Sequence, residues 1–246
     1  MENKRFARTQ MLLGAERMQK LAAAKVMIVG LGAVGGYALE ALARSGVGRF
    51  ILIDFDVFEE SNINRQILAT SHTLGQKKIE AARERVLSIN PTAEVEVWDI
   101  FVNAETIPEL IAGQPDLVID AIDALNPKCD LMQALQSAGI PFISSMGAAL
   151  KTDASQIRFG ALSSSKNCAL AKFIRKRLRH RGADISSIKC VWSDEQVDLP
   201  AGALELPETA PAEGRCRHTM GSLPTITAIF GLTIANQAIL KLSGCK

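Results

Sequence analysis

The chain has 246 residues, 48% of them apolar, and a formal net charge of +2. This length permits one α/β domain with a sizeable core, and the near-neutral balance excludes a protein that binds nucleic acid with its whole surface. Five cysteines without a C-x-x-C pair argue against a zinc site and a disulfide framework, so we expect no zinc. The polar N-terminus has no signal-peptide core, which favours a cytoplasmic protein.

Strand-like and helix-like segments alternate along residues 1–147. The expected strands are Val26–Gly30, Phe50–Asp54, Val95–Trp98, Leu117–Asp120 and Pro141–Met146. The helices expected between them are Ala33–Arg44, Gln76–Ile89, Glu105–Ile111 and Lys128–Ala138. Such alternation predicts an α/β fold with a Rossmann-like, mostly parallel sheet and helices on both faces. The carboxyl ends of the strands then share one edge, where ligands bind.

The regular alternation of strand-like and helix-like segments ends after residue 147. We nevertheless expect residues 1–246 to form a single domain. Residues 148–221 are predicted to be a smaller, substrate-facing α/β portion, with strands Ile157–Ala161 and Ile188–Trp192 around a helix at Ala169–His180. Within it, the Pro- and Glu-rich stretch Leu199–His218 predicts a mobile loop.

A closing helix is expected over residues 222–242. Its segment Leu223–Leu240 has no charge over 18 residues, near the lower limit for a membrane span. Its threonines, Asn236 and Gln237 are polar enough that a buried or dimer-facing helix is favoured over a span.

A glycine-rich turn follows the first expected strand. Gly30, Gly32 and Gly35 have the G-x-G-x-x-G spacing at the start of a helix, whose free N–H groups suit a phosphate. Asp54 ends the second strand, where a carboxylate can accept hydrogen bonds from ribose hydroxyls. The combination predicts a nucleotide site without separating NAD from ATP.

Polar residues after Asp54 favour ATP. Arg65 and Lys78 can return to the same edge, and two further cations suit a triphosphate better than the two phosphates of NAD. Asp120 and Asp123 end the fourth strand, where a carboxylate can hold Mg²⁺. The nucleotide site is therefore expected to include Asp56, Asn62, Arg65, Gln66, Lys78 and Asp123.

Six motifs appear in the order "RFARTQMLLG", "VGLGAVG", "LIDFDVFEESNINRQIL", "GQKK", "SINP" and "VIDAIDA". Their order resembles the ubiquitin-activating-enzyme (ThiF-like) superfamily, in its bacterial branch that adenylates carboxylates. The resemblance implies Gly32 at the phosphates, Asp54 at the ribose, and Arg65 and Lys78 at the triphosphate. Asn62 lies in the same pocket by this resemblance, and Asp123 lies near Mg²⁺ and the reacting phosphate. Arg8 would reach the ATP of a neighbouring subunit, so a homodimer is implied.

The chain lacks the two C-x-x-C pairs common in sulfur-carrier-activating members and has "AIDA" where they usually read "TDN". With "SSMGAALKTDASQIRFG" and "VWSDEQ", it is similar to the tRNA threonylcarbamoyladenosine dehydratase subfamily. That similarity implies ATP-dependent cyclisation of the threonylcarbamoyl group beside the anticodon, through an acyl-adenylate. It also suggests a cysteine desulfurase system as partner and is compatible with a bound monovalent cation.

The helix at Ala169–His180 is strongly basic, and no acidic residue lies between Lys166 and Arg181. Such a face suits contact with a phosphate backbone, so we expect it to bind tRNA, and we expect no DNA partner. The predicted tRNA contacts are Lys172, Arg175, Lys176, Arg177, Arg179 and Arg181 together with His180, and Lys151 and Arg158 are expected to extend the patch.

Two alternatives remain open from the sequence. One is an adenylyltransferase for a ubiquitin-like sulfur carrier, which would share the ATP site and differ in substrate. The other is an NAD-dependent oxidoreductase or a noncatalytic Rossmann-type binding protein, against which Arg65, Lys78 and Asp123 count.

Overall fold

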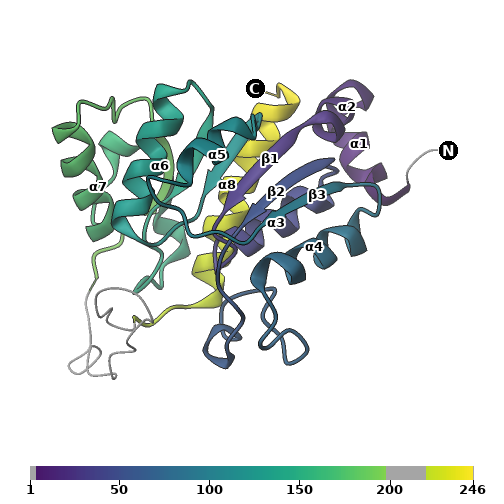
Figure 1. The fold of residues 1–246 in the computed structure, drawn as a ribbon, viewed down its shortest axis with the longest axis horizontal. Helices are drawn as coiled ribbons and strands as arrows, with labels where there is room; N and C mark the ends of the chain where they lie inside the picture. Colours follow the sequence, from purple (N-terminus) through teal and green to yellow (C-terminus); the bar gives the residue numbers. More distant parts are fainter. Residues whose placement is uncertain (1–3, 198–219, 246) are drawn as a thin grey trace.

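Seven strands form one sheet in the order β3-β2-β1-β4-β5-β7-β6 (Figure 1). The structure is a computed structural model that describes residues 4–197 and 220–245, so the predicted loop Leu199–His218 lies outside the described residues. All neighbouring strands are parallel except β6, which is antiparallel to β7. The strands are β1 Lys25–Val29, β2 Arg49–Ile53, β3 Glu94–Trp98, β4 Leu117–Asp120, β5 Phe142–Ser145, β6 Ile157–Ala161 and β7 Lys189–Ser193.

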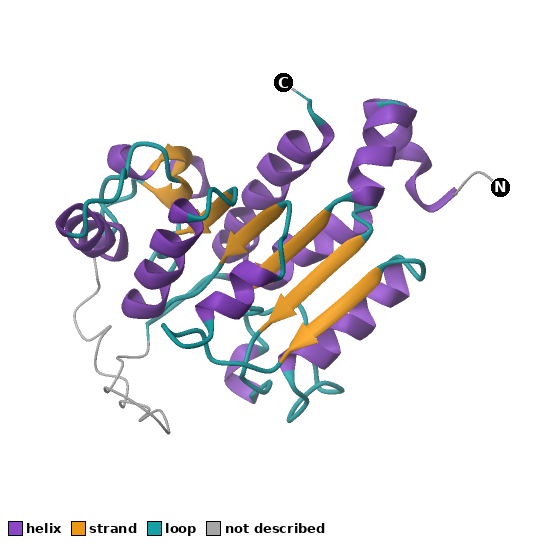
Figure 2. Ribbon diagram, turned by 45° about the horizontal axis from the view of Figure 1, so that its top comes forward, coloured by secondary structure: helices purple, strands orange, loops and turns teal. Residues whose placement is uncertain are grey.

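Helices cover both faces of the sheet (Figure 2). They are α1 Ala7–Leu13, α2 Ala15–Ala23, α3 Gly35–Arg44, α4 Lys78–Ile89, α5 Ile107–Ala112, α6 Leu125–Ser137, α7 Ala169–His180 and α8 Pro224–Ser243. Short 3-10 turns lie at Lys4–Phe6, Glu60–Asn62, Ala154–Gln156 and Leu162–Ser164. The predicted α/β fold with a mostly parallel sheet is confirmed, and each predicted strand and helix is present within a few residues of its expected bounds.

Alternate side chains of the central strands point to opposite faces of the sheet and pack into two separate hydrophobic cores. Val26 and Ile28 of β1 pack with α3, α4 and α8, whereas Met27 and Val29 pack with α5 and α6. A third cluster joins α6 and α7 to Cys190 and Trp192 of β7. Because the central strands are buried on both faces, their runs are almost wholly apolar, as parallel strands require.

The C-terminal strands β6 and β7 extend the same sheet, since β7 pairs with β5. The closing helix α8 then crosses back to the central strands and packs on α3. At their crossing, a Cβ added to Gly231 would lie 2.4 Å from the carbonyl oxygen of Val34, so only glycine permits this approach.

Helix α8 is long and apolar enough to cross a membrane by length and composition. Its side chains Ile226, Phe230 and Ile234 are nevertheless buried in the main core. Of its apolar 18-residue window, 39% is buried, so one side of the helix packs in the core, as expected for the buried or dimer-facing helix favoured from the sequence.

Candidate nucleotide site

The three loop glycines have different structural roles. Gly30 adopts a left-handed φ of 93°, and an added Cβ would lie 2.9 Å from the carbonyl oxygen of Ala121. On Gly35 an added Cβ would lie 1.8 Å from the carbonyl oxygen of Gly30. On Gly32 an added Cβ would have Nε2 of Gln66 as its nearest neighbour, at 3.9 Å. Gly30 and Gly35 therefore shape the turn itself, and Gly32 is the glycine whose backbone a ligand can approach.

Asp54 joins the glycine loop to the end of β2. Its Oδ2 accepts a hydrogen bond of 2.7 Å from the Leu31 N–H, and its Oδ1 accepts one of 2.9 Å from the Asp56 N–H. Burial raises the pKa of this carboxyl, against the opposing charge of Lys78 and the two backbone hydrogen bonds. Each oxygen keeps a second lone pair that could receive a ribose hydroxyl.

Lys78 is the first residue of α4, and its side chain is only 7% exposed. Its Nζ lies 2.9 Å from Oδ2 of Asp56 and 5.9 Å from the centroid of the Phe58 ring. The neighbouring Lys77 points elsewhere and pairs with Asp99 at 3.1 Å. The structure thus brings two of the predicted site residues, Asp56 and Lys78, into direct contact beside Asp54.

The segment after β2 carries the other predicted nucleotide ligands. Asn62 is buried, and its Oδ1 accepts a hydrogen bond from the Glu59 N–H at 3.3 Å as part of a capping box. Arg65 donates from Nη1 to the Ser61 carbonyl and to Asn64 Oδ1, both at 2.8 Å.

Gln66 faces the glycine loop with an unsatisfied acceptor. It is buried, and its Oε1 is the one buried side-chain nitrogen or oxygen without a hydrogen-bond partner among residues 4–197 and 220–245. A buried orphan acceptor carries a desolvation cost unless a partner arrives. Its position beside Gly32 therefore fits a ligand that donates a hydrogen bond there.

The two aspartates at the end of β4 have separate environments. Asp120 is fully buried, forms a 2.8 Å ion pair with the equally buried Lys128, and accepts a 2.7 Å hydrogen bond from Ser144 Oγ. Both aspartates lie at the end of β4 as expected, but Asp120 is not available to a cation from solvent, because it is buried and paired with Lys128. Asp123 is exposed, and it is the one of the pair that a cation from solvent can reach.

No pattern in the sequence predicts the pairing of Lys128 with Asp120. A lysine inside an amphipathic helix is normally solvated, and only the packing of α6 against β4 and β5 buries it. Phe55 and Phe101 were also missed. Their rings form an edge-to-face pair at 5.0 Å, half exposed, and Phe55 directly follows Asp54.

The predicted basic patch divides into bound and exposed side chains. Arg175 donates to Ser165, Arg177 to Oδ1 of Asn126, and Arg181 pairs with Asp130 at 2.6 Å. Lys172, Lys176, Arg179 and His180 are exposed. The acidic partner that α7 itself lacks is thus supplied by α6.

The extension of this patch to Lys151 is wrong. Lys151 is buried, and its Nζ donates to the carbonyl oxygens of Asn167 and Glu195, which removes it from the surface. Arg158 lies on the edge strand β6, where its Nη1 donates to the Ser155 carbonyl and its Nε lies 3.7 Å from Oδ2 of Asp194.

The buried cysteines Cys190 and Cys129 have raised thiol pKa values, whereas a nucleophilic cysteine needs a lowered one. Burial raises the pKa of the Cys190 thiol to about 12, and burial also raises the pKa of Cys129. A thiol that stays protonated cannot attack a carboxylate derivative. Cys216 lies outside the described residues.

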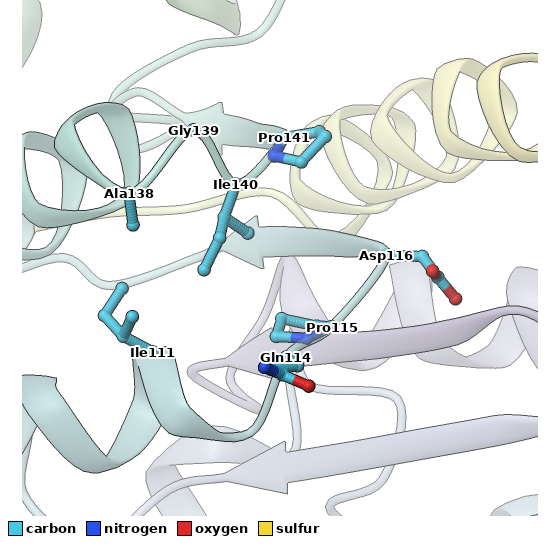
Figure 3. Close-up of a pocket in the computed structure, with 8 residues that line it drawn as sticks. All are labelled: Ile111, Gln114, Pro115, Asp116, Ala138, Gly139, Ile140 and Pro141. Carbon is cyan, nitrogen blue, oxygen red and sulfur yellow. The ribbon is translucent and has the colours of Figure 1, made fainter.

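A cavity of about 510 Å³ lies between the ends of α5 and α6 (Figure 3). Its lining includes Pro115 and Asp116 just before β4, and Ile140 and Pro141 just before β5. It therefore opens at the amino ends of the strands, the edge opposite to the glycine loop, and is separate from the nucleotide site.

The chain matches the ThiF family over residues 6–246. It is 38% identical to tRNA threonylcarbamoyladenosine dehydratase of Bacillus subtilis over 190 residues, covering 77% of this chain and 74% of that protein. It is 33% identical to the Escherichia coli enzyme of the same name, over 97% of this chain and 93% of that one. The crystal structure of the E. coli dehydratase TcdA in complex with ATP superposes with a TM-score of 0.86 at 31% identity, covering 98% of this chain and 94% of that one. Glycine loop, strand-end carboxylates and full-length similarity agree, and the chain belongs to the ThiF family.

Proposed function

We propose that this protein is an ATP-dependent tRNA threonylcarbamoyladenosine dehydratase. The observation that carries the proposal is the similarity to dehydratases of this name along almost the entire chain, including a structure with bound ATP. The glycine loop, Asp54, Lys78 and the unsatisfied Gln66 supply a site of matching chemistry.

The reaction needs activation of a carboxylate, since hydroxide is a poor leaving group. Transfer of AMP from ATP to the threonyl carboxylate forms an acyl-adenylate and releases pyrophosphate. The carbamoyl group of the same side chain then attacks the activated carbon, AMP leaves, and the net change is loss of water. Because the nucleophile is tethered to the carbon it attacks, a high effective molarity replaces a catalytic cysteine.

In this proposal the enzyme positions the phosphates and neutralises their charge. Lys78 and Arg65 bind the phosphates at the end of β2, and Asp54 binds the ribose. Phe55 and Phe101 offer an apolar wall beside that ribose, suited to a nucleobase.

Mg²⁺ is proposed to bind between Asp123 and the phosphates. Within residues 4–197 and 220–245, no group of three or more His, Cys, Asp or Glu side chains is arranged to hold a metal. One carboxylate is sufficient for Mg²⁺, which keeps several waters and takes phosphate oxygens as ligands. The metal would neutralise charge that develops on the leaving pyrophosphate.

The proposed active unit is a homodimer. Arg8 lies on α1, whose side chains Met11 and Leu12 are 84% and 82% exposed. Two fully exposed apolar residues on one short helix fit a surface that a second copy covers. Arg8 would then reach the triphosphate of the partner subunit.

We also propose a tRNA-binding surface, a cellular compartment and a partner for this protein. The tRNA backbone is proposed to lie along α7, the reaction is proposed to occur in the cytoplasm, and a cysteine desulfurase system is a further proposed partner. DNA is not a proposed ligand, and a monovalent cation remains an untested addition.

Mass analysis of nucleosides tests the function directly. The protein is mixed with ATP, Mg²⁺ and tRNA that carries threonylcarbamoyladenosine, and the tRNA is digested. We expect that nucleoside to lose the mass of one water, with release of AMP and pyrophosphate. An unchanged nucleoside, together with ATP–pyrophosphate exchange in the presence of a diglycine-ended carrier protein, would instead identify an adenylyltransferase.

A further inference from the structure

Helix α7 presents one face made almost entirely of unpaired cations. Lys172, Lys176 and Arg179 follow one another at positions i, i+4 and i+7, a spacing that aligns them along one side of a helix. The buried stripe Ala171, Ile174 and Leu178 lies on the other side. No described residue forms an ion pair with these three cations, so their charge is directed at solvent.

The three remaining arginines, two in α7 and Arg181 directly after it, have structural partners. Arg175, Arg177 and Arg181 contact Ser165, Asn126 and Asp130, respectively. Their donors are used to fix α7 against α6 and the turn before it. The surface available to a ligand is therefore narrower than the run of basic letters suggests.

An aromatic side chain lies beside the unpaired cations. Phe173 is 55% exposed, and Lys176 follows it by three residues, so the ring and the ammonium are neighbours on the helix surface. Exposed aromatic rings among cations are the usual means by which proteins hold unpaired bases, by stacking, while the cations hold the phosphates.

The start of α7 lies at the edge of the sheet that carries the nucleotide site. Arg177 contacts Asn126 and Arg181 contacts Asp130, so α6 and α7 run parallel. Phe173 precedes Arg177 by about one turn, whereas α6 begins at Leu125, two residues after Asp123. The first turn of α7 thus extends about 6 Å beyond the level of Asn126, toward the strand ends.

We propose that the exposed face of α7, formed by Lys172, Phe173, Lys176 and Arg179, is a platform for unpaired nucleotides of the substrate tRNA. Phe173 stacks on a base, and the three cations bind consecutive phosphates. The inference rests on the proposed function and narrows it, because it assigns single-stranded RNA rather than duplex backbone to this helix.

The apolar content of this face argues against a membrane as the ligand. A helix that lies on a lipid surface buries a broad apolar face, and α7 exposes only Phe173 beside its cations, since its other large apolar residues are in the core. A polyanion with stacking surfaces matches both features.

Salt dependence separates the two kinds of contact. Affinity for unmodified tRNA and for an isolated anticodon stem-loop is measured between 50 and 200 mM salt. The triple variant Lys172→Ala/Lys176→Ala/Arg179→Ala is expected to bind RNA more weakly than the unsubstituted protein. Its plot of log K against log salt should also be less steep, with a negative slope that is smaller in magnitude by about 2, at about 0.7 per phosphate contact. Lys241→Ala, an exposed lysine at the end of α8, is the matched control and should change neither quantity.

Substitutions of Phe173 test the stacking. Phe173→Leu keeps an apolar side chain but has no ring, so a loss of about 5- to 150-fold in affinity with an unchanged salt slope is expected. Phe173→Trp should restore binding. Because all four side chains are exposed, ATP binding and the thermal midpoint should equal those of the unsubstituted protein, which excludes misfolding.

Three results would each overturn the platform. The first is wild-type affinity in Phe173→Leu, and the second is an unchanged salt slope in the triple variant. The third is binding to vesicles of anionic lipid that is lost in the same variants. If the unsubstituted protein dehydrates tRNA while these variants keep its KM, the platform is refuted and the proposed function remains. If it binds tRNA through this face without dehydrating it, the function is refuted and the platform remains.

Discussion

Lys78 differs from the adjacent Lys77 in burial as well as in direction. Its ammonium is placed between Asp56 and the Phe58 ring at the end of β2, whereas Lys77 reaches outward to Asp99. Both residues occur in one "GQKK" motif, and the helix start at Lys78 decides which of them turns inward.

We expect Lys78→Ala to lower kcat/KM for ATP by about 10- to 150-fold, the value of one lost charge-assisted contact of about 1.5–3 kcal/mol. Lys77→Ala is the matched control and should leave ATP turnover within about twofold. Pyrophosphate release measures both. Equal effects of the two substitutions would remove Lys78 from the proposed triphosphate site.

Lys128 and Asp120 form a fully buried ion pair that holds the turn before Asp123. Besides its pair, Lys128 donates a 2.9 Å hydrogen bond to the Ile122 carbonyl, and Asp120 accepts one of 3.1 Å from the Ile122 N–H. Lys128→Met leaves a buried carboxylate without its cation, so we expect unfolding in urea to be easier by about 3–5 kcal/mol.

The double variant Asp120→Asn/Lys128→Met removes both charges and keeps an acceptor for the Ile122 N–H. Its loss of unfolding free energy should be smaller than that of Lys128→Met alone. If the loss in the double variant equals the sum of the losses in Asp120→Asn and Lys128→Met, the two side chains act independently. The charge pairing would then not be what stabilises this turn.

At the scale of elements, Glu40 connects α3 to α4. Its carboxylate accepts hydrogen bonds from Arg44 at 2.7 Å and from Arg85 at 2.8 Å. Burial raises the pKa of Glu40, but the hydrogen bonds and charges of the two arginines outweigh it, so the pKa is lowered from its ordinary 4.5. The folded protein therefore binds its proton less readily than the unfolded chain does.

A lowered carboxyl pKa contributes stability above the unfolded pKa, and this contribution is lost as the pH falls through the folded pKa. We expect Glu40→Gln to reduce the free energy of unfolding by about 1–2 kcal/mol at pH 7, since the arginines are partly screened by water. The difference should vanish below the folded pKa, where Glu40 is protonated. Denaturation at several pH values measures this, and a difference independent of pH would contradict the assignment.

Prediction of elements from the sequence succeeded where periodicity and burial agree. The strands of the central sheet are continuous apolar runs between turn residues, which explains why their positions were predictable. Helices α1 and α2 were not predicted, because α1 has no fully buried residue and α2 buries only Leu21, so neither has a buried apolar stripe to signal it. Lys151 and Lys128 were misjudged or missed because the atoms that bury them come from distant segments, such as Glu195 for Lys151.

For the candidate site too, local features were predictable from the sequence and contacts between distant segments were not. The positions of Gly30, Asp54 and Lys78 at one edge of the sheet were predictable, since they lie at turns and element ends whose geometry is local, whereas their roles toward a nucleotide stay a prediction. The pairing of Asp56 with Lys78 and the restraint of Arg177 by Asn126 depend on contacts between segments, and the sequence offers no pattern for either.

At the scale of the whole molecule, a homodimer with shared sites can be tested by complementation. Arg8→Ala and Lys78→Ala homodimers should each have strongly reduced activity, because each lacks one cation of the shared site. After mixing and exchange, half of the dimers are mixed, and each of these has one complete site, so we expect about a quarter of full activity. ATP turnover measures the recovery, and no recovery despite subunit exchange would place Arg8 outside the partner's site.

In the proposed nucleotide site, the contact between Asp56 and Lys78 would give the phosphate-binding lysine a counter-anion of its own. An incoming nucleotide must compete with this internal carboxylate, a requirement that disfavours weakly charged anions and favours the triphosphate tail. In the proposed reaction, Asp56 would pair with Lys78 again once pyrophosphate has left, so the ammonium would have a partner between turnovers. The same pair that holds the lysine in place between turnovers would therefore decide which anions can displace Asp56, and it would weaken the binding of ATP and of pyrophosphate alike.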